Sequence, residues 1–393
     1  MKKMKLILLI FTLMNFVVSM TALVFNGILD KVAISLNVSI ANSGLLGTMY
    51  AYGAALGVPV TLILFGKINR TKMLKIMLII TIIMTGALIL CHNFSQLLIV
   101  RFIMGISANG YGVLATSIVI SFASKNKQGR TLAFLIMGSS LALVVGIPLT
   151  RILSNTIDWR VIFLGLMVIM VFSLIIFQFF LPETNQQSRS FDFENEFNLF
   201  KKRKTLVVIG SSIIIFIGYG SFYNYITPYL LETFPATEKL MSGFLVILGI
   251  ASFIGNLLGG FIADCIGYRK SLLIGCFLQF LFIGFIYIFQ SNQWLSIMFA
   301  ILWQMSAWFI GLQLNTGIAQ ATKNKSSFII SLNSSAIQLG TAVGANISAS
   351  LIATVGMKKI ILVSLLASAI MTIIQFISLK QDISNTTENT VIE

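Results

Sequence analysis

The sequence predicts an all-α membrane protein with twelve transmembrane helices in two pseudo-symmetric six-helix bundles, and three observations lead to this prediction. The 393 residues are 57% apolar and 10% charged, whereas soluble domains carry roughly 25% charged residues. A short polar segment divides the chain into two apolar parts of similar length, and features of the first part recur in the second. The lipid bilayer is therefore the expected solvent for most of the chain.

The polar segment is residues 182–204, which hold nine charged side chains. A segment of this polarity cannot lie in hydrocarbon, so we expect it to be exposed to water. The predicted organisation is an N-terminal six-helix bundle over 1–181, a cytoplasmic linker over 182–204, a C-terminal six-helix bundle over 205–380 and a cytoplasmic tail over 381–393.

Each apolar part contains six runs that are long enough to cross a bilayer, which takes about 20 mostly apolar residues. The predicted spans are 6–26, 43–65, 74–91, 97–121, 131–153, 161–181, 206–230, 242–263, 271–290, 294–316, 328–354 and 360–379. The basic start of the chain resembles a signal peptide, but the first run is longer than a signal core and no small-x-small cleavage site follows it. We therefore expect this run to remain as the first span.

Basic residues between the runs lie mainly on one side of the predicted bilayer. The side with both termini and the linker holds 20 Lys and Arg residues, the other side holds six, and Arg101 lies inside a span. The positive-inside rule makes the richer side cytoplasmic. We therefore expect a multi-pass protein of the cell membrane (the bacterial cytoplasmic membrane) with both termini in the cytoplasm. The net charge of +15 then reflects topology, and we expect no nucleic-acid partner.

The two parts of the chain resemble each other at an offset of 198 residues. Ala-Ser-Lys-Asn-Lys at 123–127 follows the fourth run, and Ala-Thr-Lys-Asn-Lys at 321–325 follows the tenth. Gly146 in the fifth run lies 198 residues before Gly344 in the eleventh. Matches at one offset in equivalent places indicate duplication of a six-span unit, with the two copies in the same orientation.

Closely spaced glycines occur in spans 2, 5, 8 and 11, and in span 5 Gly146 lies beside Pro148. If each six-span half is divided into two units of three spans, each unit contributes one of these four helices. Small residues four apart let helix backbones approach closely. We therefore predict that these helices form a shared sliding interface between the two bundles, with ordinary helix packing as the alternative. The residues expected there are Gly146, Pro148, Gly255, Gly259, Gly340 and Gly344.

Several motifs resemble those of the major facilitator superfamily. The segment Gly260-Phe-Ile-Ala-Asp264-Cys-Ile-Gly267-Tyr-Arg269-Lys270 resembles its loop signature G-x-x-x-D-x-x-G-x-R-K, and Arg101-Phe-Ile-Met-Gly105 is similar to its second motif. Gly146-Ile-Pro148 followed by Asp158-Trp-Arg160 resembles spans 5 and 6 of its twelve-span drug–proton antiporters. Within these, the chain most resembles arabinose-efflux-like and purine-efflux permeases.

This resemblance implies the major facilitator fold and a secondary active transporter that exports a small organic molecule by alternating access. The implied cargo is a drug-like compound, a nucleoside or base, or a sugar, and the implied coupling is proton antiport. It implies no enzymatic activity, no cofactor and no metal. The expected partners are the small-molecule substrate, protons and the lipid bilayer, and we expect a monomer. The loop signature is expected to act as a gating latch, formed by Gly260, Asp264, Gly267, Arg269 and Lys270.

Proton antiport is not supported by the residues themselves. Relatives commonly carry a carboxylate inside span 1, where this chain has Ser-Met-Thr-Ala-Leu at 19–23, and no acid falls deep inside a predicted span. An intramembrane ionisable residue is the usual group in a proton relay. Asp30, at the outer end of span 1, is the plausible substitute. A facilitated-diffusion uniporter is therefore the alternative.

Arg101 is the basic residue placed clearly within a span. An isolated charge there costs roughly 2.5–3.5 kcal/mol on insertion scales, so it should have a partner or water. Arg101, Gly105 and Asn109 recur every four residues and share one helix face. We expect a cavity-lining stripe in which Arg101 faces Asp30 across the outer mouth, with snorkelling to the outer interface as the alternative.

The remaining candidates for the transport pathway are neutral. Aromatic rings with a few amides suit a flat or amphipathic, uncharged ligand, and for each residue packing or anchoring is the alternative. The predicted substrate or coupling residues are Arg101, Asn109, Asp30, Tyr223, Asn224, Trp303, Gln304, Trp308, Asn333 and Gln338. Further neutral candidates are Asn15, Asn26, Tyr219, Gln313 and Asn315.

Other classes of membrane protein are less compatible with the sequence. A membrane enzyme or lipid scramblase would be expected to cluster His, Asp or Glu near the interface, but the chain has one histidine, His92, and no paired intramembrane acids. A channel would need a lined selectivity ring. The chain lacks the G-x-x-x-x-G-K-[ST] loop of nucleotide-driven pumps. Its cysteines, Cys91, Cys265 and Cys276, have no paired spacing that would indicate a disulfide or a metal site.

Overall fold

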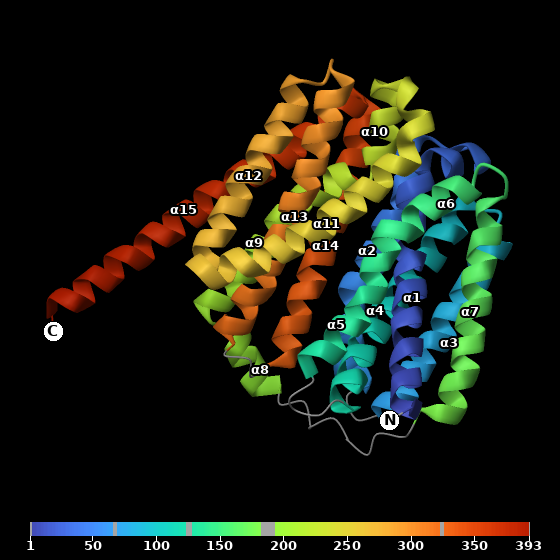
Figure 1. Cartoon of the computed structure of the whole chain (residues 1–393), viewed down its shortest axis with the longest axis horizontal. Helices are drawn as coiled ribbons and strands as arrows, with labels where there is room; N and C mark the ends of the chain where they lie inside the picture. Colours follow the sequence, from blue (N-terminus) through green and yellow to red (C-terminus); the bar gives the residue numbers. More distant parts are fainter. Residues whose placement is uncertain (1, 66–68, 123–127, 182–192, 323–325, 393) are drawn as a thin grey trace.

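The computed structural model is a bundle of long helices in two parts (Figure 1). It describes residues 2–65, 69–122, 128–181, 193–322 and 326–392, and within these ranges the regular structure is entirely helical. The repeat segment 123–127, residues 323–325 of its counterpart, and residues 182–192 of the predicted linker lie outside the described residues. The predicted fold class, an all-α membrane protein, is confirmed.

The first half runs through seven α-helices and one π-helical turn. They are α1 (Lys2–Ser35), α2 (Ile40–Phe65), α3 (Arg70–Leu90), α4 (Phe94–Phe122), α5 (Gln128–Leu141), η2 (Ala142–Gly146), α6 (Ile147–Leu153) and α7 (Trp159–Phe180). The second half adds eight α-helices and two short 3₁₀ segments. They are α8 (Phe193–Phe200), α9 (Arg203–Tyr223), α10 (Ile226–Thr233), η3 (Pro235–Leu240), α11 (Met241–Ile266), α12 (Tyr268–Ile288), α13 (Gln293–Ala321), α14 (Ser327–Val355), η4 (Met357–Lys359) and α15 (Ile360–Ile392).

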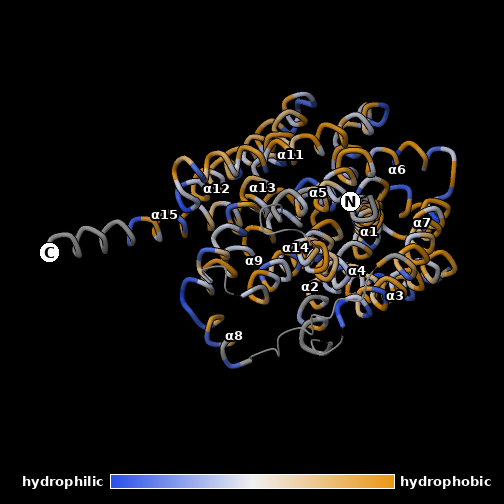
Figure 2. The backbone as a smooth tube through the Cα atoms, turned by 60° about the horizontal axis from the view of Figure 1, so that its bottom comes forward, coloured by the Kyte–Doolittle hydropathy of each residue, from blue (hydrophilic) through white to orange (hydrophobic). Residues whose placement is uncertain are grey.

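Eleven of the twelve predicted spans fall on helical segments that are long and apolar enough to cross a membrane. The other predicted span, 43–65, falls on α2, which is 26 residues long. Apolar residues follow the helices, and hydrophilic residues gather at the helix ends and on α8 (Figure 2). We call the face that holds the start of α1 the lower face, and the opposite face, where α1 ends at Ser35, the upper face (Figure 1). That the lower face is cytoplasmic stays a prediction.

Local sequence signals account for several helix ends. The Asp158 side chain accepts a hydrogen bond from the Arg160 backbone N–H (2.8 Å) at the start of α7, and Ser326 does the same for Ile329 (2.9 Å) at the start of α14. Such side-chain acceptors satisfy N–H groups that a helix cannot pair itself. Gly267 ends α11 with φ of 82°, in the left-handed region that residues with a side chain rarely adopt.

Three helices differ from the uninterrupted runs expected from hydropathy. α1 continues past the predicted end at residue 26 to Ser35 and contains one residue with non-helical angles, Ile28 (φ −134°, ψ 21°). The fifth run widens into the π-helical turn 142–146 just before Pro148. Proline cannot donate the usual helical hydrogen bond and its ring clashes with the preceding turn, so a wider turn relieves that clash. The seventh run is divided into α9 and α10 around Asn224.

The predicted linker and tail are also partly helical. Residues 193–200 form α8, and α9 already begins at Arg203 inside the expected linker. The segment expected as a tail, 381–393, continues α15 as far as Ile392.

The two halves meet through the helices that the glycine pattern singled out. α2 packs against α14, and α11 packs against η2 and α6. One buried apolar cluster joins Leu29, Leu143 and Ile147 of the first half to residues of α9, α10 and α11. The close approaches between halves occur at Gly44, where a methyl group would overlap the Tyr225 ring, and at Gly249, where it would meet the backbone of Leu143.

The glycines predicted for that interface lie elsewhere, and the prediction is wrong for them. Added methyl groups at Gly255 and Gly344 would overlap the carbonyl oxygens of Met305 and Ile217, which belong to the same half. Gly259 and Gly340 likewise face α13 and α9 of their own half, and Gly146 faces Met20 on α1. Thus Gly255 and Gly259 of the eighth span pack on the tenth, Gly146 of the fifth packs on the first, and Gly340 and Gly344 of the eleventh pack on the seventh. These repeated contacts stabilise each bundle and do not form the seam between bundles.

Replacing Gly344 by alanine is expected to destabilise the second bundle. The new methyl group would overlap the Ile217 carbonyl oxygen, and overpacking of this kind typically costs about 1–3 kcal/mol. The matched control is Gly210→Ala on α9, where a methyl group would have no neighbour within 4 Å and the better helix propensity of alanine is worth up to about 1 kcal/mol. Thermal unfolding of the purified protein should show a lower midpoint for Gly344→Ala alone. Equal midpoints would show that α9 and α14 are not in close contact.

Candidate functional site

A cavity of about 380 Å³ lies between the two halves. Residues of α1, α2, α4 and α5 line it from the first half, and residues of α9, α13 and α14 line it from the second. Its volume is in the range of sites for small organic ligands, about 300–1,000 Å³. The position between two packed bundles is where a ligand can contact both.

The first-half wall of the cavity carries amides and hydroxyls. Its polar side chains include Asn15, Ser19, Asn26, Asn109 and Ser139. The Asn15 amide donates to the Leu135 carbonyl (2.8 Å) on α5, and the Asn109 amide donates to the Ala54 carbonyl (2.5 Å) on α2. These hydrogen bonds hold both side chains in fixed orientations.

The second-half wall supplies most of the aromatic rings, Phe216, Tyr219, Tyr223 and Trp308, and it also carries the amides of Asn224 and Gln338. The Tyr219 and Tyr223 rings stack with centroids 4.8 Å apart and planes 16° apart. Behind them, the Trp303 ring stacks on Tyr219 at 5.5 Å and 14°. Tyr223, Tyr219 and Trp303 therefore form a layered stack, of which Tyr219 and Tyr223 reach the cavity.

Gln304 supports this stack from behind. Its amide nitrogen lies 2.9 Å from the Ser252 hydroxyl and 3.4 Å from the Tyr219 hydroxyl, which links α13 to α11 and α9. Both Trp303 and Gln304 are fully buried and outside the cavity lining. They were predicted to bind substrate directly, and the structure instead places them in a second layer.

The cavity is electrically neutral among the residues that the structure describes. No Asp, Glu, Lys, Arg or His occurs in the described lining. A charged ligand would lose its hydration there without gaining a counter-charge. The site therefore favours an uncharged ligand that offers hydrogen-bonding groups on one side and an apolar face on the other.

Arg101 lies beside this cavity and is completely buried. Its guanidinium donates to the carbonyl oxygens of Thr21 (2.5 Å), Leu46 (3.0 Å) and Ala22 (3.4 Å). The same group lies 4.5 Å from the centroid of Tyr50, a residue of the cavity wall. Arg101 thus joins α1, α2 and α4 and supports the wall without reaching the ligand space, and it does not snorkel to the outer interface.

The predicted pairing of Arg101 with Asp30 is wrong. The Asp30 carboxylate forms an ion pair with Arg151 (2.5 Å) near the upper face, where the Arg151 side chain is 3% exposed. Arg151 also donates to the Gly27 carbonyl (3.4 Å). Neither Asp30 nor Arg151 belongs to the cavity lining.

Five of the ten predicted substrate or coupling residues do line the cavity. They are Asn109, Tyr223, Asn224, Trp308 and Gln338. The other five, Arg101, Asp30, Trp303, Gln304 and Asn333, do not. Asn333 is buried between Ser212 (2.7 Å) and Asn315 (3.1 Å), so its amide has an internal structural role.

Of the further neutral candidates, Asn15, Asn26 and Tyr219 line the cavity, whereas Gln313 and Asn315 do not. Tyr50 is a wall residue that the sequence analysis missed. A signal for it existed, since Gly47, Tyr50, Ala51 and Ala54 follow the spacing i, i+3, i+4 and i+7 of one helix face.

The predicted gating residues gather at the lower ends of α11 and α12. Asp264 and Lys270 are exposed, and the Arg269 guanidinium donates to the Tyr268 hydroxyl (3.2 Å). Tyr268 in turn lies against Gly317 of α13. That this turn works as a latch stays a prediction.

The chain is similar to known transporters over most of its length. A family model described as Major Facilitator Superfamily matches residues 11–345. The chain is 29% identical over 353 residues to the "Uncharacterized MFS-type transporter YbcL" of Bacillus subtilis (strain 168), covering 89% of this chain and 90% of that protein. It is 26% identical over 363 residues to a "Probable sugar efflux transporter" of Helicobacter pylori (strain ATCC 700392 / 26695), covering 89% and 91%.

Solved structures share the fold. The crystal structure of a bacterial homologue of the human lysosomal transporter Spinster, in an inward-facing and unoccupied conformation, matches with a TM-score of 0.73 and 15% identity, covering 95% of this chain and 96% of that one. The human organic anion transporter MFSD10 matches with a TM-score of 0.68 and 14% identity, covering 95% and 99%.

Replacing Arg101 by methionine is expected to destabilise the first bundle by about 3 kcal/mol or more. The change removes hydrogen bonds from a charged donor to the carbonyl oxygens of Thr21, Leu46 and Ala22, and a hydrogen bond to a charged group is worth about 1.5–3 kcal/mol. The matched control is Arg160→Met, which removes a partly exposed pair with Asp158 that is worth about 0–1 kcal/mol. Thermal unfolding of both purified variants checks this. Equal midpoints for the two variants would contradict the supporting role of Arg101.

Proposed function

Because the chain belongs to the Major Facilitator Superfamily, we propose that it exports a small, uncharged, polar organic molecule, with a sugar as the first candidate. In this proposal it is a secondary active transporter of the cell membrane that works by alternating access, with both termini in the cytoplasm. Nucleosides and neutral drug-like compounds are the alternative cargoes. The activity requires no cofactor and no covalent chemistry.

The observation that carries this proposal is that the cavity combines aromatic rings, mainly from the second half, with amides and hydroxyls from both halves. Sugar rings present C–H groups on their faces and hydroxyls around their edges. The faces suit the Tyr219, Tyr223 and Trp308 rings of one wall, and the hydroxyls suit amides such as Asn26 and Asn109 of the other. Similarity to proteins named as sugar efflux transporters also supports this choice.

Alternating access is supported by how the halves are joined. On the upper side of the cavity, the Thr227 hydroxyl donates to the Asn26 carbonyl (2.9 Å) and the Tyr225 hydroxyl donates to the Ala41 carbonyl (3.3 Å). Each net hydrogen bond is worth only about 0.5–1.5 kcal/mol. Contacts of this size can be exchanged between two states that differ by a few kcal/mol.

Proton antiport is the coupling that we propose, with Asp30 as the titrating group. Protonation of Asp30 would remove the counter-charge of Arg151, which also holds the Gly27 carbonyl. Gly27 packs against Ile147 of its own half, and a methyl group there would also lie 3.7 Å from Leu245 of the second half, so this charge change would act close to where the halves meet. Facilitated diffusion is the second candidate, and the absence of an ionisable acid or base from the described lining favours it.

Replacing Trp308 by leucine is expected to raise the KM for the transported sugar at least several-fold, because it removes an aromatic face of the cavity. The matched control is Trp294→Leu on the same helix, since Trp294 is 67% exposed and outside the cavity. Counterflow of labelled neutral sugars into proteoliposomes measures this and separates a carrier from a channel. If no sugar exchanges while nucleosides or neutral drugs do, the cargo assignment is wrong. Equal KM values for both variants would exclude Trp308 from the site.

The coupling to protons is tested by measuring the export of substrate from proteoliposomes under an imposed pH gradient. The wild-type protein should export faster when protons flow inward, and Asp30→Asn should lose this stimulation while it retains counterflow. Asp158→Asn, which alters an exposed acid beside Arg160, is the control and should behave as wild type. If the wild-type flux does not depend on the pH gradient, proton antiport is excluded and facilitated diffusion is the mechanism.

A further inference from the structure

We propose that the lower end of α9 carries a binding site for an anionic phospholipid. Its centre is the basic segment, defined as Lys201, Lys202, Arg203 and Lys204, four consecutive cations whose side chains are all exposed. The segment joins α8 to α9, and the apolar span of α9 begins directly after it. The inference is independent of the proposed cargo.

The basic segment is held in a fixed place by α8. The Ser326 hydroxyl donates to the Glu196 carboxylate, which fastens α8 to the start of α14. Leu199 and Phe200 pack against a buried apolar cluster that includes residues of α9, α13 and α14. The backbone N–H of Lys201 donates to the Phe197 carbonyl (3.0 Å), so the first lysine of the segment continues the turn of α8.

One aromatic contact also orders the first lysine. The Lys201 ammonium lies 4.4 Å from the centroid of the Phe197 ring, and Phe197 is itself 44% exposed. A cation above an exposed ring leaves its remaining N–H groups directed outward. An ordered ammonium beside an exposed phenyl group is suited to the boundary between headgroups and acyl chains.

Exposed apolar side chains follow the basic segment within one helical turn. Leu206 and Val207 are exposed, whereas Thr205 and Val208 beside them are buried. A ligand that places an anionic group on the basic segment would therefore place its adjoining part on Leu206 and Val207. This arrangement fits a phospholipid, whose phosphate adjoins acyl chains, and a free phosphate would use only the charged part.

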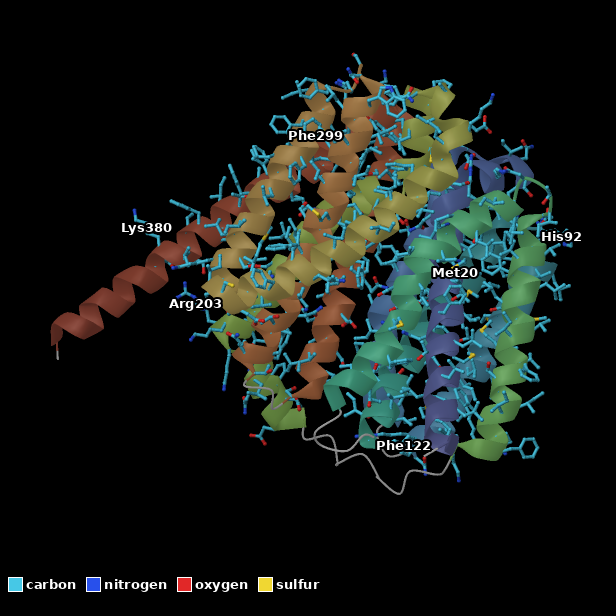
Figure 3. The ribbon with its side chains drawn as sticks, in the orientation of Figure 1. Met20, His92, Phe122, Arg203, Phe299 and Lys380 are labelled. Atoms are coloured by element: carbon cyan, nitrogen blue, oxygen red, sulfur yellow. The ribbon has the colours of Figure 1, made fainter. Side chains whose placement is uncertain are left out.

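α15 adds a fifth cation, Lys380, near the height of Leu206 and above the basic segment. The Gln375 amide donates to the Ser211 hydroxyl (3.2 Å), which fixes the register of the two antiparallel helices. Lys380 follows Gln375 by five residues, and Leu206 precedes Ser211 by five residues. At a rise of about 1.5 Å per residue, Lys380 and Leu206 therefore lie at about the same height. Lys380 is exposed and lies on the same side of the molecule as Arg203 (Figure 3).

The four cations of the basic segment outnumber the two acids of α8. On α8, the Glu196 carboxylate accepts from Ser326, and Glu194 is the other acid of that helix. The excess of lysine and arginine on the lower face is also what topology alone predicts. Topology does not explain why the basic segment is ordered and is followed directly by exposed apolar side chains. Polybasic segments beside a span attract anionic lipids, which explains both features.

The test is retention of lipid by the full-length protein. The protein is extracted from vesicles of equal parts phosphatidylglycerol and phosphatidylcholine, and bound lipid is counted by native mass spectrometry. We expect preferential retention of phosphatidylglycerol by the wild type and a loss in Lys201→Gln/Lys202→Gln of about fivefold for each charge removed. The matched control is Lys358→Gln/Lys359→Gln, which removes two adjacent exposed lysines on the upper face and should retain phosphatidylglycerol as the wild type does.

Three results would overturn the proposal. They are equal retention of the two lipids by the wild type, equal loss in both double variants, and displacement of phosphatidylglycerol by millimolar inorganic phosphate. The last result would indicate a site for phosphate alone. Thermal unfolding of both double variants shows whether they are folded. If Lys201→Gln/Lys202→Gln proves unfolded, Lys380→Gln is measured in its place, and unchanged retention in that folded variant also counts against the site.

Discussion

The constraint behind this structure is that hydrocarbon offers no partner for backbone N–H and C=O groups, so nearly all of them must be paired within helices. Departures from regular helix are therefore informative. In the described residues they fall at Ile28, at the π-helical turn 142–146 and at Asn224. Each lies close to the cavity or to a contact between halves. Arg101 belongs to the same pattern, because it supplies extra donors to carbonyl oxygens of α1 and α2.

The packing between helices is repeated in the two halves, but the side chains that line the cavity are not. Gly53 and Gly255 press on the fourth helix of their own half, and Gly146 and Gly344 press on the first. These equivalent contacts give two bundles of the same architecture. The side chains that face the cavity do not follow the duplication, since Tyr50 is the one aromatic residue of the described first-half lining, whereas the second half supplies Phe216, Tyr219, Tyr223 and Trp308. Packing glycines can thus stay alike in both copies while cavity residues differ, because the two sets face different neighbours.

The fold could be predicted from the sequence because hydropathy, the polar segment and the repeat each depend on many residues. The site could be predicted only in part, because a helical pattern does not fix how a helix is rotated against its neighbours. Trp308 lines the cavity, while Trp303 on the same helix lies behind Tyr219. Arg151 falls at the end of the predicted span 131–153 and was not considered as a partner of Asp30, so Arg101 was given that partner instead. Backbone carbonyls, the actual partners of Arg101, carry no signal in the sequence.

The neutral cavity restricts how any ion could be coupled to transport. A proton and a substrate cannot compete for one site if the described lining offers no group that titrates near neutral pH. Coupling would then have to act on the equilibrium between states, through contacts that exist in only one of them. The pair of Asp30 and Arg151 is in a suitable place, because Arg151 also binds the Gly27 carbonyl, and Gly27 packs against Ile147 near Leu245 of the second half. In such a mechanism the substrate determines occupancy of the cavity, and the proton determines which side the cavity opens to.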